Sequence, residues 1–277
     1  MNGLQIVMKS LNPVTLCMGF ASVCVGCAAS SIHGYIDILP SLLCLVYALL
    51  IQCTGNIGHR YYDEKYGYGE NVRDGISNED EDGRPTIYIL YEGVKVFYIL
   101  ALTVGIAILI TAGWWALIPG ITILAINRLN NHGKHPWNHT VLYPLITFIL
   151  FGPICVISTS MVNLSSGHTN ALNWTNIEPS VVLSIIIGLL AMNSHIVFRA
   201  SQSLTGLGMY TSLTGKYGIK ATAGVLTVTT LIYSILLAFT PYLIELSISP
   251  SFMILPILSM TFSFYIIYLL LHKRYMI

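Results

Sequence analysis

Long apolar runs that are almost free of charge constrain this chain more than any other feature. Of its 277 residues, 55% are hydrophobic and 9% are charged, and the mean hydropathy is +0.71. Soluble domains carry about 25% charged residues, and this chain could not cover a water-exposed surface with so few. Apolar runs of 18 or more residues are typical of transmembrane helices. We therefore expect an all-α protein that forms one integral-membrane domain over residues 1–277.

Apolar runs predict a polytopic helical bundle of about eight transmembrane spans. The predicted ranges are 13–31, 36–56, 91–111, 113–127, 141–163, 179–198, 221–243 and 251–271. Proline lies within or beside several of them, as at Pro119, Pro153 and Pro256. Membrane helices tolerate proline because neighbouring groups satisfy the freed backbone.

The basic residues predict the orientation of the bundle. If the amino terminus is cytoplasmic, all 13 Lys and Arg residues fall on the cytoplasmic face, as the positive-inside rule requires. The opposite face has Asp37, Glu178 and Glu245 as its candidate charges. We therefore expect both termini in the cytoplasm. The net charge of +1 gives no reason to expect a nucleic-acid partner.

Acidic residues are concentrated in one cytoplasmic connection. The chain has 12 Asp and Glu residues, and eight of them lie between Asp63 and Asp82. Just before this stretch, Asn56, His59, Arg60 and Asp63 have the spacing of residues that share one helix face. If the helix continues through them, these polar side chains meet at its cytoplasmic end.

Two kinds of ligand suit this connection. Asp63 and Glu64 could hold Mg²⁺ through carboxylate oxygens, with substrate phosphate completing the coordination shell. The cations that could bind a diphosphate are Arg60, Lys65 and Arg84. A solvated, charged loop at the membrane surface explains the same composition equally well, and it is the favoured interpretation for residues 78–82 taken alone.

Four segments give the chain a resemblance to a known family. Residues 49–67 read Leu-Leu-Ile-Gln-Cys-Thr-Gly-Asn-Ile-Gly-His-Arg-Tyr-Tyr-Asp-Glu-Lys-Tyr-Gly. This segment resembles the first motif of the UbiA family of membrane prenyltransferases, above all in the branch that prenylates dihydroxynaphthoate. Residues 10–16 (Ser-Leu-Asn-Pro-Val-Thr-Leu), 84–85 (Arg-Pro) and 148–153 (Phe-Ile-Leu-Phe-Gly-Pro) resemble further segments of that branch.

The resemblance implies a UbiA-like bundle that acts on a lipid. Family members join a polyprenyl diphosphate to an aromatic acceptor, using Mg²⁺ held by two aspartate-rich motifs on cytoplasmic loops. It implies Asp63 and Asn56 as catalytic residues, a polyprenyl diphosphate or another anionic lipid as partner, and a location in the bacterial inner membrane. Family members normally have nine spans, and the last of them is therefore expected to be absent here.

The match fails at three of the four family aspartates. The first aspartate of the first motif is Arg60, and the second motif falls on Ser201 and Thr205. Residues 93–177 and 179–244 contain no Asp or Glu at all. Metals stabilise a departing diphosphate as Lewis acids, and loss of one preorganised electrostatic donor lowers a rate about 10²–10³-fold. We therefore expect Mg²⁺-dependent prenyl transfer to be weakened or lost.

Three further groups of polar residues have open interpretations. They are the acidic residues Asp74, Glu79, Asp80 and Asp82, the histidines His132, His135 and His139, and the intramembrane trio Asn193, Ser194 and His195. The acidic group could replace the lost ligands. The histidines have a zinc-like spacing, but their Asn-, Gly- and Pro-rich surroundings favour a surface loop. The trio is explained by a functional site and by hydrogen bonds between helices about equally well.

Three functional hypotheses follow. The first is a diverged UbiA-type prenyltransferase, and the second is a non-catalytic relative that binds a polyprenyl or other lipid. A third, a small-molecule transporter, is disfavoured because polar residues gather in number inside one predicted span alone.

Overall fold

Apolar side chains cover the outside of the helices as well as their inside, as expected for a bundle surrounded by lipid. The computed structural model describes residues 2–32, 34–66, 78–134, 136–166, 173–204, 212–244 and 254–272. Ile99, Leu102 and Phe262 are 63%, 51% and 66% exposed, although each lies in the middle part of a long helix. Such a surface suits hydrocarbon and would aggregate in water.

The described residues fold into helices alone, apart from one isolated bridge between Glu79 and Pro85. In chain order the helices are α1 (Gly3–Ser10), α2 (Pro13–Ser31), α3 (Ile38–Tyr66), α5 (Thr86–Ala112), η1 (Trp114–Ala116), α6 (Leu117–Asn131), η2 (Trp137–His139), α7 (Tyr143–Ile149), η3 (Leu150–Ile157), α8 (Ser158–Ser165), α9 (Trp174–Leu204), α10 (Leu213–Leu243) and α11 (Ile254–His272).

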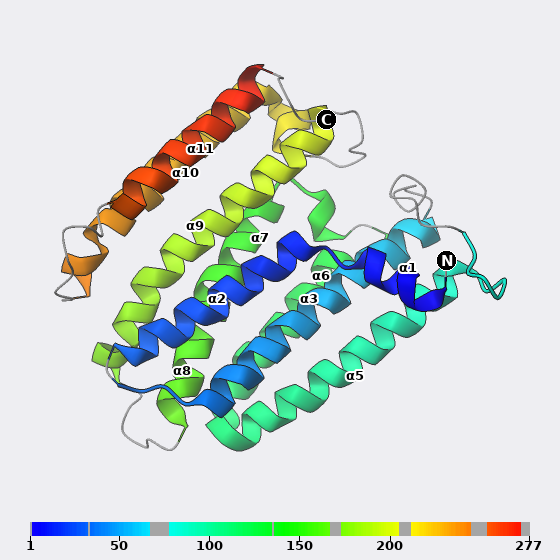
Figure 1. Cartoon of the computed structure of the whole chain (residues 1–277), viewed down its shortest axis with the longest axis horizontal. Coiled ribbons are helices and arrows are strands. Elements are labelled where there is room, and N and C mark those ends of the chain that lie inside the picture. Colours follow the sequence, from blue (N-terminus) through cyan, green and yellow to red (C-terminus); the bar gives the residue numbers. More distant parts are fainter. Residues whose placement is uncertain are drawn as a thin grey trace.

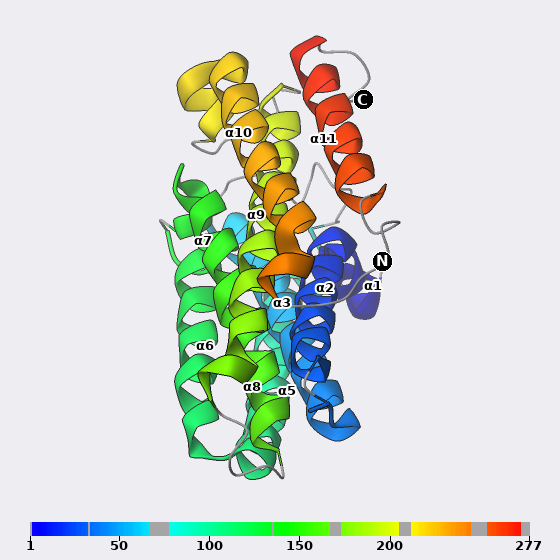
Figure 2. The ribbon, with the colours of Figure 1, turned by 90° about the vertical axis from the view of Figure 1, so that its left-hand side faces the viewer.

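Helix α9 lies at the centre of the bundle, and the other helices are arranged around it (Figure 1). It packs against α2, α7, η3 and α10. At one edge α11 packs on α10, and at the other edge α3 packs on α5 (Figures 1 and 2). One apolar cluster, which includes Val23, Tyr47, Ile108 and Val162, joins α2, α3, α5 and α8.

All eight predicted spans are helical, and the all-α membrane fold is confirmed. Six helices in the described residues are long and apolar enough to cross a membrane by themselves, and α1 with α2, bent by 60°, would make a seventh. The predicted span 113–127 forms η1 and α6 instead of one long helix. Because α6 has 15 residues, it is about 22 Å long, which is shorter than a hydrocarbon core of about 30 Å.

The apolar runs do not predict helix α1, which lies outside every predicted span. Its eight residues are too few to form a span, and a capping box between Asn2 and Gln5 stabilises its first turn. Ile6 is fully buried against Ile57 of α3 and Leu90 of α5. The helix therefore anchors the amino-terminal segment beside the end of α3.

A close contact between two glycines joins the fifth predicted span to α9. Pro153 lies inside η3, a π-helical segment, as expected where a residue without an N–H interrupts the α-helical bonding. A Cβ atom on Gly152 would overlap the backbone oxygen of Ser184 and lie 2.8 Å from the Cα of Gly188. Small residues of this kind let membrane helices approach closely.

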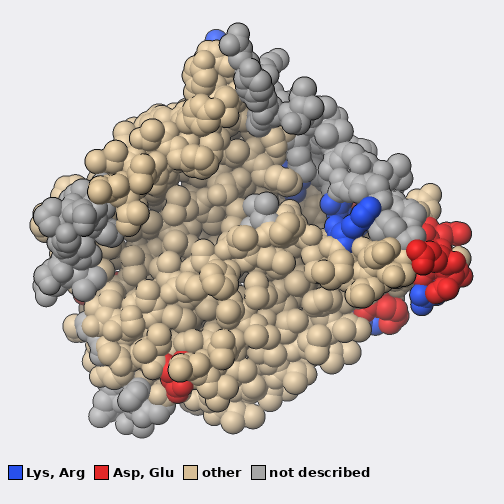
Figure 3. Space-filling view, viewed as in Figure 1, with Lys and Arg blue, Asp and Glu red and all other residues tan. Residues whose placement is uncertain are grey.

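Charged side chains gather at one end of the bundle, which we call the polar end (Figure 3). It comprises the carboxyl end of α3, helix α1, the turn 78–85 and the connection between α6 and α7. Asp37 and Glu178 lie elsewhere, because they stand just before α3 and in the second turn of α9. Glu178 is 17 residues from His195, about 25 Å along α9. Glu245 lies outside the described residues.

The glycine contact predicts a position-specific loss of stability. We expect Gly152→Ala to lower the unfolding temperature in detergent by an amount equivalent to about 1–3 kcal/mol, because the added methyl group overpacks the junction with α9. Gly224→Ala on α10 is the matched control, since a Cβ there meets no atom within 4 Å. Equal unfolding temperatures for the two variants would contradict the close contact.

Candidate functional site

Helix α3 continues beyond its predicted end at residue 56 and ends at Tyr66. One helix therefore carries Asn56, His59, Arg60 and Asp63, which is the condition for the predicted shared face. Asn56 donates a hydrogen bond from Nδ2 to Oγ1 of Thr15 at 2.9 Å. This bond joins α3 to the start of α2, within the segment 10–16 that resembles a family motif.

Asp63 lies between two histidines. Its side chain is 2% exposed, and one carboxylate oxygen is 2.6 Å from Nδ1 of His59. The other oxygen is 3.7 Å from Nε2 of His139, which comes from the connection between α6 and α7. The three possible ligand atoms all lie within 4.8 Å of one another. We call His59, Asp63 and His139 the Asp63 cluster.

Asparagines at the end of α6 position His139. Asn131 donates from Nδ2 to the backbone oxygen and to Oδ1 of Asn127, at 3.0 Å each, and Nδ2 of Asn138 lies 3.5 Å from Oδ1 of Asn131. The end of α6 can approach α3 because Gly55 has no side chain, and a Cβ there would lie 2.5 Å from Oδ1 of Asn127. The asparagines therefore join the short helix η2, with His139 at its end, to the end of α6, which packs on α3.

His132 packs next to this cluster without belonging to it. Its ring lies against Tyr62 and Tyr98, with centroid distances of 5.2 Å and 5.7 Å, and a Cβ on Gly58 would overlap its Nε2. Burial, and secondarily the charge of Arg128, lowers the pKa of His132 to about 4. The ring is therefore neutral at physiological pH.

Helix α9 brings further polar groups to the same region. The ring of His195 packs edge-on against Tyr143, with the ring centroids 4.2 Å apart, and His195 lies near His59 and Arg199. A small cavity of about 10 Å³ is lined by polar side chains from α9, α10 and the α6–α7 connection. These are Asn138, Thr140, His195, Arg199, Ser212 and Thr214.

Two of the cations predicted to bind a diphosphate have partners of their own. Arg84 pairs with Asp80 at 2.7 Å and with Asp82 at 3.2 Å. Desolvation raises the pKa of Asp80, but hydrogen bonds from Arg84 and Asp82 outweigh it and hold this pKa below its usual range. Lys65 is exposed and lies over tyrosine rings of α3, including that of Tyr61 at 5.6 Å. Arg60 is half-buried on α3.

The remaining predicted residues divide into described and undescribed ones. Glu64 is half-buried and is not part of the Asp63 cluster. Ser201, at a family aspartate position, donates its hydroxyl to the backbone oxygen of Phe198 at 2.7 Å. Asp80 and Asp82 of the acidic turn are engaged with Arg84, and no residue of that turn joins the cluster. Thr205, Asp74 and His135 lie outside the described residues.

The Asp63 cluster suits Mg²⁺ poorly. Mg²⁺ prefers an octahedron of oxygen ligands, usually carboxylates, phosphates and water. In the described residues this cluster offers one carboxylate and two imidazoles. Imidazole nitrogen suits zinc, copper, iron and nickel better than magnesium. By itself, this cluster of described residues does not supply the carboxylate ligands of a two-metal Mg²⁺ arrangement.

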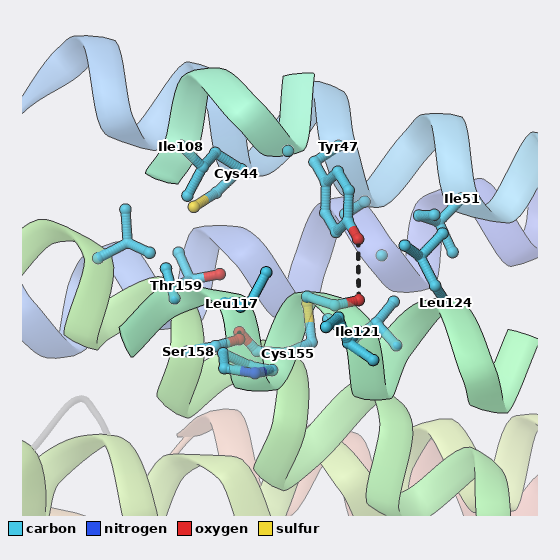
Figure 4. Close-up of a pocket in the computed structure, with 18 of the residues that line it drawn as sticks. Cys44, Tyr47, Ile51, Ile108, Leu117, Ile121, Leu124, Cys155, Ser158 and Thr159 are labelled. Atoms are coloured by element: carbon cyan, nitrogen blue, oxygen red, sulfur yellow. Dashed lines mark hydrogen bonds between the residues drawn. The ribbon is translucent and has the colours of Figure 1, made fainter. Parts of the chain in front are cut away.

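An apolar cavity lies along the part of α3 that precedes Asp63 in the sequence, farther from the polar end. It has a volume of about 220 Å³ and is lined by α2, α3, α5, α6, η3 and α8. Figure 4 shows Tyr47, Ile108, Leu124 and other side chains around it, and Tyr47 donates a hydrogen bond across one side to the backbone oxygen of Gly120 at 3.1 Å. Gln52 is the lining residue of α3 nearest to Asp63 in sequence. Both polar atoms of its amide are buried without a hydrogen-bond partner.

The contacts of His59 and His139 with Asp63 do not follow from the sequence pattern alone. The spacing of four between His59 and Asp63 indicates a shared helix face and nothing more specific. The glycine and proline around His139 favour a surface loop. One signal does point to the contact: this loop and the acidic connection are both predicted on the same face of the membrane.

The buried state of His132 predicts a pH dependence of stability. In the folded state the pKa of His132 is about 4, whereas histidine in the unfolded chain has a pKa near 6.5. As the pH falls below 7, the unfolded state therefore binds more protons than the folded state, and stability decreases. We expect a destabilisation of roughly 2 kcal/mol between about pH 7 and pH 5 from this group. His132→Phe, which keeps the ring packing, should reduce the fall in unfolding temperature over this range. An unchanged pH profile would contradict the burial of His132.

Known proteins resemble this chain in sequence and in fold. No protein-family model matches it. It is 24% identical over 192 residues to the 1,4-dihydroxy-2-naphthoate octaprenyltransferase of Bacillus subtilis, covering 69% of this chain and 60% of that protein. The enzyme of the same name from Escherichia coli is 25% identical over 162 residues, which cover 56% of this chain and 52% of that protein. The match thus spans between half and two thirds of each relative.

A solved structure described as digeranylgeranylglyceryl phosphate synthase in membranes has the same fold. The TM-score is 0.61 at 20% identity, and the match covers 99% of this chain and 89% of that one. This likeness covers the whole described bundle and not one motif. By sequence and by fold, the chain is therefore related to the UbiA family of membrane prenyltransferases, as its first motif predicted.

Proposed function

We propose that this protein binds a polyprenyl diphosphate, with its isoprenoid tail in the apolar cavity and its diphosphate at the polar end. The observation that carries the proposal is the position of the cavity on α3. Its lining includes Gln52, which precedes Asp63 by 11 residues, about 16 Å along the helix. A ligand with an apolar chain and a charged head fits this arrangement, in which an apolar cavity is followed along α3 by charged side chains.

The tail is proposed to lie among the helices that meet around Tyr47. Burial of apolar carbon contributes about 25 cal/mol per Å² of surface removed from water, and a polyprenyl chain has little else to contribute. The unpartnered amide of Gln52 suits the junction between tail and head, where a polar atom of the ligand can satisfy it.

The head is proposed to bind through cations and not through a pair of magnesium ions. Arg60 on α3 and Arg199 on α9 supply guanidinium groups from two helices, and arginine suits bidentate contact with phosphate. The small cavity beside Arg199 and His195 adds hydroxyl and amide donors. Lys65 remains a candidate of the same kind at an exposed position, whereas Arg84 is paired with Asp80 and Asp82.

Catalysis is proposed to be weak or absent when Mg²⁺ is the metal. Allylic ionisation leaves a highly charged diphosphate, and Asp63 is the one carboxylate of its cluster among the described residues. Serine at position 201 and threonine at position 205 are poor replacements for carboxylate ligands. A slow prenyl transfer to an aromatic acceptor is the second candidate, and the relatedness to the octaprenyltransferases favours it.

Binding and turnover measured side by side test this proposal. The full chain in detergent or nanodiscs is given a labelled polyprenyl diphosphate, Mg²⁺ and a panel of aromatic acceptors. We expect saturable binding with little or no prenylated product. Turnover that Asp63→Ala abolishes would instead establish an active Mg²⁺ enzyme and overturn the proposed loss of chemistry.

Filling the cavity tests where the tail binds. Ala48→Trp places an indole among the lining residues and is expected to weaken binding of the long-chain diphosphate by tenfold or more, about 1.4 kcal/mol, while inorganic diphosphate binds as before. Ala221→Trp is the matched control, because Ala221 is exposed on α10 and does not line the cavity. Unchanged affinity in Ala48→Trp would place the tail elsewhere.

A further inference from the structure

The Asp63 cluster has the composition of a transition-metal site. Its members come from two segments far apart in the chain, with His59 and Asp63 one turn apart on α3 and His139 at the end of η2. Two histidines and one carboxylate are the protein ligands of several catalytic zinc sites and of non-haem iron sites. Such sites keep at least one coordination position for water or substrate.

The distances are close to those that a bound metal requires. Ligand atoms about 2.0–2.2 Å from a tetrahedral zinc lie about 3.3–3.5 Å from one another. Here one carboxylate oxygen of Asp63 is 2.6 Å from Nδ1 of His59, the other is 3.7 Å from Nε2 of His139, and one ligand atom from each residue lies within 4.8 Å of the other two. Local movement of these side chains would bring the three ligand atoms to the distances of a metal site.

Burial also favours a metal at this position. Asp63 is 2% exposed, and an ionised carboxylate is taken out of water at a high free-energy cost unless it is paired or coordinates a cation. Histidine must be neutral to coordinate a metal, and a divalent ion at this position would add positive charge beside the Asp63 carboxylate.

The surroundings of His139 resemble the outer shell of a metal site. Asn131 bonds to Asn127 within α6, and Nδ2 of Asn138 in η2 lies 3.5 Å from Oδ1 of Asn131; such supporting residues orient ligands and raise metal affinity. Asn138 and Asn130 are each 3% exposed or less. These amides join η2, and with it His139, to the end of α6.

We propose that His59, Asp63 and His139 bind one divalent transition metal of the zinc type, with an open position for an external oxygen such as that of water or a phosphate. The site replaces the carboxylate ligands that the family motifs would supply with imidazoles, which changes the metal preference from Mg²⁺ to Zn²⁺, Co²⁺ or Fe²⁺. The inference does not depend on the proposed function, because the cluster binds metal or fails to do so whether or not a lipid binds.

Metal titration of the purified full chain tests the site. After removal of any affinity tag and treatment with a chelator, the protein is titrated with Zn²⁺ and separately with Co²⁺, whose visible absorption reports nitrogen and oxygen ligation. We expect one equivalent to bind, the unfolding temperature to rise with bound metal, and excess Mg²⁺ to leave the bound Co²⁺ spectrum unchanged.

Substitutions then assign the binding to these residues. His139→Ala is expected to weaken Zn²⁺ binding by at least about 10–100-fold, a loss that even changes in supporting residues cause, and His139→Asp should retain part of the affinity because it keeps a ligand. His132→Ala is the matched control, since His132 lies in the same connection but outside the cluster. Unfolding temperatures of the metal-free variants establish that each one folds.

Two results would overturn the proposal. One is the absence of stoichiometric Zn²⁺ and Co²⁺ binding by the folded parent protein, which would leave the cluster as a hydrogen-bonded Asp–His pair. The other is binding by His139→Ala that is as tight as that of the parent. Polyprenyl diphosphate binding, measured on the same metal-free samples, distinguishes a failure of the metal site from a failure of the proposed function.

Discussion

The burial of the Asp63 carboxylate is the constraint on which the polar end of this protein depends. A carboxylate at 2% exposure needs partners, and the chain supplies them from its own helix through His59 and from a distant connection through His139. To bring His139 there, α6 must end close to α3, which Gly55 and Gly58 permit. The asparagines at the end of α6 then fix the loop. The two histidines contact the buried Asp63 carboxylate, and the glycines and asparagines allow and support those contacts. Apolar packing alone gives no reason for this combination of residues.

Much of the fold could be predicted because membrane helices leave a strong signal in the sequence. Each predicted span forms helix. Helix α3 also continues through residues 56–63, which the predicted shared face of Asn56 and Asp63 requires. The failures have local causes. Helix α1 is too short to register as a span, and α6 begins four residues after the start of its apolar run because Gly113 adopts a φ of 93° and η1 follows it. Apolar periodicity does not report such local breaks.

The candidate site was harder to predict than the fold. The sequence identified Asp63 as the surviving carboxylate, but its partners are determined by tertiary contacts between residues about 80 positions apart. Arg84 looked available for phosphate, and the structure pairs it with Asp80 and Asp82. In both cases residue type predicted the chemistry, whereas the neighbouring chain segments decided which groups could perform it.

The relation to membrane prenyltransferases is consistent with a lipid site whose metal chemistry has changed. The cavity along α3 is apolar and lies among helices that the solved relative shares. Among the described residues, the Asp63 cluster has one carboxylate, and its other possible ligands are imidazoles. The scarcity of acidic residues after Glu92 agrees with the proposal of lipid binding without the usual magnesium chemistry.

Equilibrium binding of a polyprenyl diphosphate to the full chain, with and without added Mg²⁺, tests this account most directly. If cations of the protein bind the diphosphate, the dissociation constant will change little when Mg²⁺ is added. If the affinity instead increases tenfold or more, about 1.4 kcal/mol, magnesium still bridges protein and ligand, and the account of a changed metal chemistry is wrong.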